Sequence, residues 1–170
     1  PAKIMIISAL NPCLCGLATD NGGINCTCTP WQIAKYQAKI SGPLLDRVDL
    51  QIEVPRVPFA ELSGDTAAEG SGEIKKRVET ARQIQRARLG TMGTANSEMN
   101  TRQVRLFCRL DSACKDLLHR AYKQLGLSAR AHDRILKVAR TIADLAGEPE
   151  IRANHLAEAI QYRALDRRVG

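Results

Sequence analysis

From residue 73 onward, the sequence repeats aliphatic residues at the three- and four-residue spacing of amphipathic helices. The most regular stripe follows Ser128, a good helix N-cap, and ends before Gly147. It consists of Ile135, Val138, Ile142 and Leu145. Aromatic residues make up only 4% of the chain, so the core has to be built from aliphatic side chains. We therefore expect a bundle of about four or five helices, over residues 73–89, 101–108, 112–124, 129–146 and 154–165.

The first part of the chain contains two candidate strands. Residues 3–10 form an isoleucine-rich run of the kind found in parallel sheets, and the Asn11-Pro12 pair ends it. Residues 48–54 alternate apolar and polar side chains, as a half-buried strand does. Both segments are therefore predicted to be strands.

Between these segments, Thr29-Pro30 is a favourable start for a helix that runs to about Ile40. The buried side of this helix is predicted to contain Trp31, Ala34 and Ala38. The predicted fold is therefore mainly α with a small β portion of about two strands. We divide the chain into residues 1–59, a small, acidic and Gly-rich linker over 60–72, and a helical domain over 73–170.

Six cysteines occur, and four of them form two C-x-C pairs in a loop rich in Gly and Asn. These four are Cys13, Cys15, Cys26 and Cys28. Cysteines spaced this closely pair poorly with each other in disulfides, whereas four thiolates suit one tetrahedral zinc ion. Free thiols of a cytoplasmic protein are the alternative. Cys108 and Cys114 lie in helical segments and are expected to be small core residues.

Three polar residues are candidates for contacting a ligand. Asn11 follows a predicted strand, where open sheets place ligand-contacting groups, although it can equally cap a turn. Arg47 stands between a Ser-Gly-Pro turn and the second predicted strand, so it is suited to reach a phosphate; an Asp-Arg pair exposed on a loop is the alternative. Arg130 lies in the first turn of a helix, where the helix dipole disfavours a cation unless an anion is nearby. Arg134 and Arg140 are expected to be ordinary surface charges.

The chain is basic, with a net charge of +7 and a pI near 9.3, which favours acidic partners such as nucleic acid. The predicted helix over 73–89 carries six basic residues and two acidic ones. Its basic face is either a surface for DNA or a partner protein, or simply a solvated face. No apolar run approaches the roughly 20 residues that span a bilayer, and no signal peptide is visible.

The motifs for nucleotide hydrolysis are absent from this sequence. It has no Gly-Lys dipeptide, hence no phosphate loop, and no apolar run ends in an Asp-Glu pair. Its three histidines are scattered over helical segments with no Cys or Ser partner. Because the sequence starts at Pro1 in an apolar run, we expect a piece of a longer protein that does not hydrolyse nucleotides alone.

Several stretches resemble the bacterial Mg-chelatase-like AAA+ ATPases of the competence protein ComM group. They are ISALNPCLCG at 7–16, CTC at 26–28, KISGPLLDRVDLQIEVP at 39–55, VETARQIQRAR at 78–88, LSARAHDRILKVARTIADLAG at 127–147 and HLAEAIQYRALDR at 155–167. The resemblance covers nearly the whole chain. The family's cysteine loop usually reads N-P-C-P-C-G, and Leu14 replaces the second proline here.

The resemblance implies the C-terminal part of an AAA+ α/β module with its helical lid, and places the phosphate loop and the Mg²⁺-binding acidic pair upstream. Asn11 resembles the sensor-1 residue, which orients the attacking water. Arg47 resembles the arginine finger, which acts on ATP in a neighbouring subunit. Arg130 resembles the sensor-2 arginine of the lid, which contacts the phosphates. The full-length protein is then expected to be a ring, most simply a hexamer, and the fragment alone a monomer.

For the biological role, the resemblance implies ATP-driven remodelling of branched or single-stranded DNA, such as branch migration or unwinding in recombination and transformation, in the cytoplasm. One alternative is the ATPase subunit of a magnesium chelatase-type metal insertase. The other is a zinc-stabilised helical interaction module without enzymatic activity. The upstream sequence and the ATPase activity of the full-length protein would discriminate among them.

Overall fold

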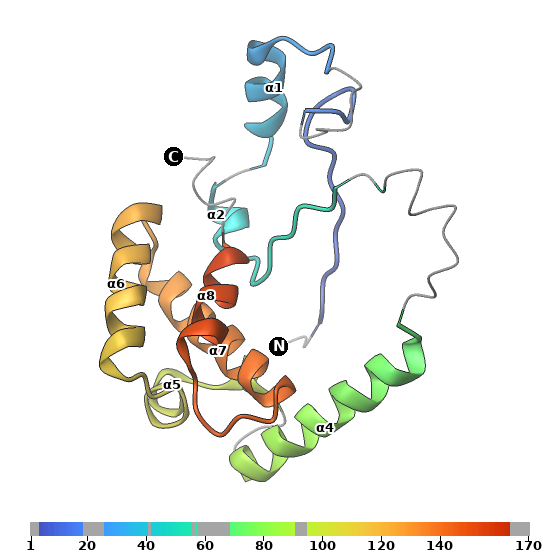
Figure 1. Cartoon of the computed structure of the whole chain (residues 1–170). Helices are drawn as coiled ribbons and strands as arrows, with labels where there is room; N and C mark the ends of the chain where they lie inside the picture. The colour runs from blue at the N-terminus through green and yellow to red at the C-terminus, as the bar shows by residue number, and fades with distance from the viewer. Residues whose placement is uncertain are drawn as a thin grey trace. The chain divides into compact units, whose positions relative to one another are not determined.

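A computed structural model describes residues 4–18, 26–40, 42–55, 57, 69–90 and 95–163. The chain divides into two compact units, one formed by Pro1–Ser41 and Glu53–Thr66 and the other by Gly42–Ile52 and Ala67–Gly170. In the described residues the elements are α1 (Pro30–Gln37), α2 (Gly42–Leu45), α4 (Ser71–Leu89), the 3₁₀ helix η2 (Asn96–Glu98), α5 (Thr101–Phe107), α6 (Ser112–Leu125), α7 (Ala129–Leu145) and α8 (Ala153–Gln161) (Figure 1). None of these helices is both long and apolar enough to cross a membrane.

The predicted small β portion is wrong, because the described residues contain helices and no strand. The apolar run that follows Lys3 is extended but pairs with no other segment in this part of the chain. Ile4, Met5, Ile6 and Ile7 are 73–85% exposed. A strand exists only when its backbone groups bond to a neighbouring strand, and apolar composition does not supply that neighbour.

The second predicted strand, over 48–54, is also wrong, and its burial is opposite to the expected one. Leu50, Ile52 and Val54 are exposed, whereas Gln51 between them is buried at 7% exposure. The Gln51 backbone N–H donates to the carbonyl of Tyr162, at the end of α8, over 2.9 Å. This segment is therefore an extended stretch docked on a helix end, not a strand in a sheet.

In the first unit, α1 begins where the sequence predicts. The Thr29 side chain accepts a hydrogen bond from the Gln32 backbone, the Gln32 side chain accepts from the Thr29 backbone, and Pro30 is the first helical residue. The predicted buried side is wrong: α1 contains no buried residue, and Trp31 is 67% exposed. Lys35 instead lies 4.6 Å from the centre of the Trp31 ring, a cation–π distance.

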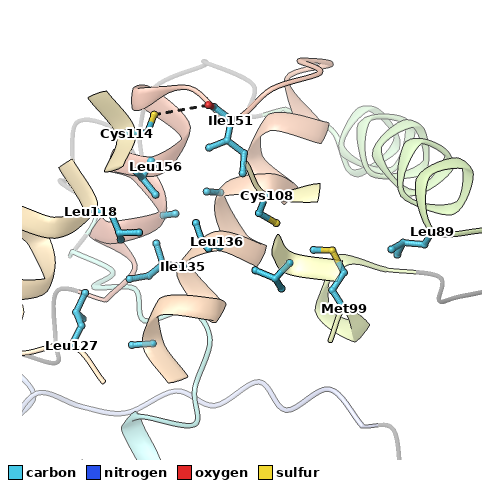
Figure 2. Packing of buried hydrophobic residues seen from close by; sticks show 14 residues of the cluster. Leu89, Met99, Cys108, Cys114, Leu118, Leu127, Ile135, Leu136, Ile151 and Leu156 are labelled. Carbon is cyan, nitrogen blue, oxygen red and sulfur yellow. Dashed lines mark hydrogen bonds between the residues drawn. The ribbon is translucent and has the colours of Figure 1, made fainter. Parts of the chain in front are cut away.

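The second unit is a helical bundle centred on α7, which packs against α4, α5, α8 and η2, while α6 packs against α8. Figure 2 shows the buried aliphatic core, to which α7 contributes Ile135 and Leu136, α6 contributes Leu118 and α8 contributes Leu156. Cys108 and Cys114 are 4% and 0% exposed, so the prediction that they are core residues is confirmed. The predicted helices in this half are also confirmed, with ends shifted by a few residues.

The capping residues explain why these helices start and stop where they do. Asp111 accepts from the Cys114 backbone at the start of α6, and Ser128 accepts from the Ala131 backbone at the start of α7. Gly126 ends α6 in the left-handed conformation, with φ of 61°. Gly126 and Ser128 therefore lie on either side of Leu127 in the short connection between α6 and α7.

A buried ionic network attaches α4 to α7. The Asp144 carboxylate, with 0% side-chain exposure, accepts two hydrogen bonds from the Arg88 guanidinium, one from Arg140 Nε at 3.1 Å and one from Asn96 Nδ2 at 2.8 Å. Arg140 also donates to the carbonyls of the turn after α7. The expectation that Arg140 is a surface charge is wrong, since it is 2% exposed. The network joins residues 56 positions apart, so sequence spacing does not reveal it.

Candidate functional site

Arg47 lies in a tight turn directly after the short helix α2. The Arg47 N–H donates to the Leu44 carbonyl at 3.0 Å, and the Val48 N–H donates to the Leu45 carbonyl at 3.1 Å. The Arg47 side chain is exposed, whereas Asp46 before it and Val48 after it are partly buried. The turn therefore presents one arginine to solvent while its two neighbours face the protein.

Residues at the start of α7 hold this turn from one side. Ser128 Oγ donates to Asp46 Oδ1 at 2.7 Å, and the Arg134 guanidinium donates to the Asp46 carbonyl. Arg134 Nε also lies 3.3 Å from Asp49 Oδ1. Arg134 was expected to be an ordinary surface charge, but its side chain is only 24% exposed. Its guanidinium therefore bonds to the Arg47 turn instead of facing solvent.

The end of α8 holds the turn as well, and Figure 1 shows it next to α2. Arg163 is 1% exposed and donates to the Val48 carbonyl, and its Nη2 lies 3.8 Å from Asp46 Oδ1. Sequence reasoning missed this residue as part of the site. Arg163 does continue the helical stripe of Leu156, Ala159 and Ile160, and an arginine in an apolar stripe is a signal that it is buried.

Arg130 projects from the first turn of α7, as predicted, and its side chain is 72% exposed. Its Nη1 lies 4.0 Å from Asp46 Oδ2. A cation at a helix N-terminus is disfavoured by the helix dipole, and the Asp46 carboxylate offsets that effect here. Arg47 and Arg130 therefore belong to the same unit and are connected through Asp46. Asn11 belongs to the other unit, where it is exposed in a loop.

The four loop cysteines come together as one cluster in the first unit. The Sγ atoms of Cys13 and Cys15 are 3.3 Å apart, and Cys26 Sγ lies 3.7 Å from the first and 3.4 Å from the second. With Cys28, all four Sγ atoms lie within 4.8 Å of one another. A tetrahedral zinc ion with Zn–S bonds of about 2.3 Å places its sulfurs roughly 3.8 Å apart, so the cluster fits such an ion.

The thiols of this cluster do not ionise alike. A backbone hydrogen bond from Leu17, together with the neighbouring Cys13 thiol, lowers the pKa of Cys15 to about 5. For Cys26 a backbone hydrogen bond from Cys28 acts downward, but the adjacent thiols and burial outweigh it and raise the pKa to about 12. Burial acts upward on the pKa of Cys13, but hydrogen bonds from the Ala18 and Leu17 backbone outweigh it and lower this pKa too. The thiolates that form first disfavour the others, because like charges repel at these distances. A cation within the cluster would remove that repulsion.

Comparison with known proteins covers both units. Residues 68–163 match the family described as magnesium chelatase, subunit ChlI C-terminal, and residues 1–62 match magnesium chelatase, subunit ChlI. The chain is 42% identical over 169 residues to competence protein ComM of Haemophilus influenzae and 40% identical over 168 residues to the uncharacterized protein YifB of Escherichia coli. Each alignment covers 98% of this chain but 32% of the relative, so the chain spans about a third of the length of these curated relatives.

Proposed function

Since this chain belongs to the family of the magnesium chelatase subunit ChlI, we propose that it works as part of an AAA+ ATPase, which hydrolyses ATP with Mg²⁺ in a ring-shaped homo-oligomer, most simply a hexamer. The chain contributes the helical lid and three phosphate-directed residues, Asn11, Arg47 and Arg130. The phosphate loop and the Mg²⁺-binding acidic pair would lie in the part of the relatives that this chain does not cover. The protein would act in the cytoplasm, where ATP is present and thiols stay reduced.

The single observation that carries this proposal is the presentation of Arg47. Its side chain is exposed, but the backbone on either side of it is held by Arg134 and Arg163. Because the backbone around it is held, Arg47 is presented at a defined place, and its planar guanidinium offers several donors to a phosphate on a neighbouring subunit. Bound Mg²⁺ would neutralise charge on the phosphates, and Arg47 would stabilise the charge that develops on the transferred phosphoryl group.

Arg130 has a different part in the proposal, since it would contact phosphates bound by its own subunit. Its guanidinium is exposed and lies 4.0 Å from the Asp46 carboxylate, a weak and separable contact. A nucleotide phosphate can therefore replace Asp46 as the anion that faces Arg130. Asn11 would orient the attacking water, an assignment that comes from the family and from its position at the end of the apolar run.

The test uses a longer version of the protein that includes the remaining two thirds of the relatives' length. Arg47→Ala should leave ATP binding unchanged and lower ATP hydrolysis by about 10³–10⁵-fold. Arg120→Ala, which removes an exposed arginine of α6, is the matched control and should leave turnover unchanged. Normal turnover in the Arg47→Ala protein would remove Arg47 from the mechanism.

A mixing experiment tests whether Arg47 acts between subunits. Arg47→Ala subunits are combined with subunits whose phosphate loop is inactivated, and neither should hydrolyse ATP alone. If Arg47 acts on ATP bound by the neighbouring subunit, mixed rings should regain activity. Activity returns wherever a subunit with an intact phosphate loop lies next to a subunit with an intact Arg47. Mixtures that remain inactive despite assembling into rings would contradict action between subunits.

We further propose that the substrate of this ATPase is DNA, branched or single-stranded. Support comes from the net charge of +7 and from α4, where all the basic residues up to Arg86 are exposed. Lys75 and Arg77 pair with Glu79 and Glu69, whereas Lys76, Arg82 and Arg86 extend the basic surface of the helix. Stimulation of ATP hydrolysis by branched DNA would favour this substrate. Stimulation only by a metal-insertase partner would favour the chelatase-type alternative.

A structural zinc ion in the cysteine cluster is the third part of the proposal. The donor set of four thiols and their mutual distances support it. Elemental analysis of the purified chain should find about one zinc per chain, and replacing Cys13 and Cys15 by Ser should abolish it. The buried, isolated Cys108→Ser is the control and should retain zinc. A folded chain without metal would support the alternative of free thiols.

A further inference from the structure

The Arg47 turn belongs to the same compact unit as the helical bundle, although the stretch from Glu53 to Thr66 does not. Gly42–Ile52 clusters with Ala67–Gly170, whereas Glu53–Thr66 clusters with the first 41 residues. The chain thus leaves the helical unit directly after this segment. The Arg47 and Val48 N–H groups bond to carbonyls within the turn itself, so the attachment of the turn to the bundle depends on contacts made by side chains and by the end of α8.

Those contacts fall on the two backbone carbonyls that flank Arg47. Arg134, from the second turn of α7, donates to the carbonyl of Asp46. Arg163, directly after α8, donates to the carbonyl of Val48. Three residues further along, the Gln51 N–H donates to the Tyr162 carbonyl at 2.9 Å. The backbone before and after Arg47 is therefore held by two different helices.

Using a buried arginine in this way is not the simplest route to stability. Arg163 is the largest fully buried side chain of the described residues, and a buried guanidinium is costly unless its charge is matched and its N–H groups are bonded. A well-packed apolar side chain often stabilises a protein as much. Charged donors do, however, fix an acceptor in direction as well as in distance. We therefore expect buried Arg163 to fix the position of the backbone that it bonds to, more than to add stability.

We propose that Arg134 and Arg163 are positioning residues that clamp the Arg47 turn to α7 and α8. Arg47 then moves as one body with the helix that carries Arg130 in its first turn. Any tilt of α7 when a nucleotide phosphate meets Arg130 is passed to Arg47, and so to the neighbouring subunit. The clamp itself is a property of this chain, and its role in catalysis rests on the proposed function.

Amide hydrogen exchange on the 170-residue chain tests the clamp without any activity assay. Arg134→Met should raise exchange at Val48 and Gln51 by about tenfold or more, because their backbone would no longer be held. Core amides such as those of Leu118 and Ile135 should keep their protection. Arg120→Met, an exposed arginine of α6, should change neither set. Unchanged exchange at Val48 and Gln51 in the Arg134→Met chain would overturn the clamp.

Arg163→Met should have the larger effect on these amides, because Arg163 is more deeply buried. If that variant unfolds, Arg163→Lys replaces it: a lysine can still donate to the Val48 carbonyl but not from two directions. The lysine variant should fold and show intermediate exchange at Val48. Wild-type protection at Val48 in a folded Arg163→Lys or Arg163→Met chain would remove Arg163 from the clamp.

Steady-state kinetics of the longer protein test the link to Arg47. Arg134→Met should lower kcat by about 10–100-fold with little change in KM for ATP, since a misplacement of about 1 Å is enough for such a loss. In an Arg47→Ala background, Arg134→Met should have no further effect, because both act through the same group. Additive losses would show that Arg134 does not act through Arg47. If Arg47→Ala itself is fully active, the proposed function fails while the exchange experiment still decides the clamp.

Discussion

At the scale of single residues, the charged side chains that are buried in this protein have close bonding partners, whereas an exposed one such as Arg130 has only a long contact. Asp144 is fully buried and yet bonded on both oxygens, by Arg88, Arg140 and Asn96. Arg130, with 72% side-chain exposure, has only a long contact to Asp46. The buried groups therefore determine the packing, and the exposed ones remain available for a ligand.

Removing the Asp144 carboxylate should be strongly destabilising. Asp144→Ala leaves the buried guanidinium of Arg140 and the mostly buried one of Arg88 without their shared anion, and breaking a buried pair in this way typically costs about 3–5 kcal/mol. Urea unfolding measures the loss of unfolding free energy. Asp116→Ala, an exposed carboxylate of α6, should change it by less than about 0.5 kcal/mol. A similar loss in both variants would contradict the role of the network.

The cysteines should differ in reactivity when no metal is bound. The pKa of Cys15 is lowered to about 5, while burial raises the pKa of Cys108 to about 12 and that of Cys114 to about 11. Iodoacetamide reacts with thiolates, so Cys15 should be alkylated first and its rate should be nearly flat between about pH 6 and pH 8. The rates of the two buried thiols should be far lower and should increase with pH. Mass spectrometry of the labelled peptides checks this order.

At the scale of elements, helix ends were predictable from the sequence because they depend on neighbouring residues. Thr29, Asp111 and Ser128 each cap the helix that follows, and Gly126 ends α6. The two predicted strands were wrong, because a strand depends on partners distant in sequence and the described residues provide none. The four loop cysteines could be predicted to cluster because they are close in sequence. Arg134 and Arg163 are far from Arg47 in sequence, so their contacts with its turn could not be predicted.

Two glycines of the helical unit should respond to substitution in opposite directions. Gly126 has φ of 61°, and an added Cβ would meet nothing within 4 Å, so Gly126→Ala should cost about 1–2 kcal/mol through backbone strain alone. Gly72 lies in the first turn of α4 with equally open space, and Gly72→Ala should stabilise the chain by about 0.4–1 kcal/mol. Thermal unfolding of both variants gives the signs. Equal shifts in the same direction would refute the conformational explanation.

At the scale of the whole molecule, the positive charge of the chain predicts how its affinity for DNA depends on salt. If α4 contacts phosphates through Lys76, Arg82 and Arg86, affinity of the chain for DNA should fall roughly 40-fold between about 50 mM and 200 mM salt. Replacing these three residues by Ala should weaken binding and remove most of this salt dependence. The control replaces Lys115, Arg120 and Lys123 of α6, which removes the same charge. Equal losses in the two triple variants would indicate nonspecific attraction to a basic chain.

The helical unit is assembled from two separate stretches of sequence, and this limits how the protein can be shortened. A chain cut back to residues 67–170 would retain α4 to α8, yet it would lose the Asp46 and Val48 carbonyls to which Arg134 and Arg163 donate. Burying those guanidinium groups without their acceptors is unfavourable. The smallest piece of this chain that folds alone therefore includes residues 42–52. A fragment that starts after this segment would lack part of the structure that holds its helices.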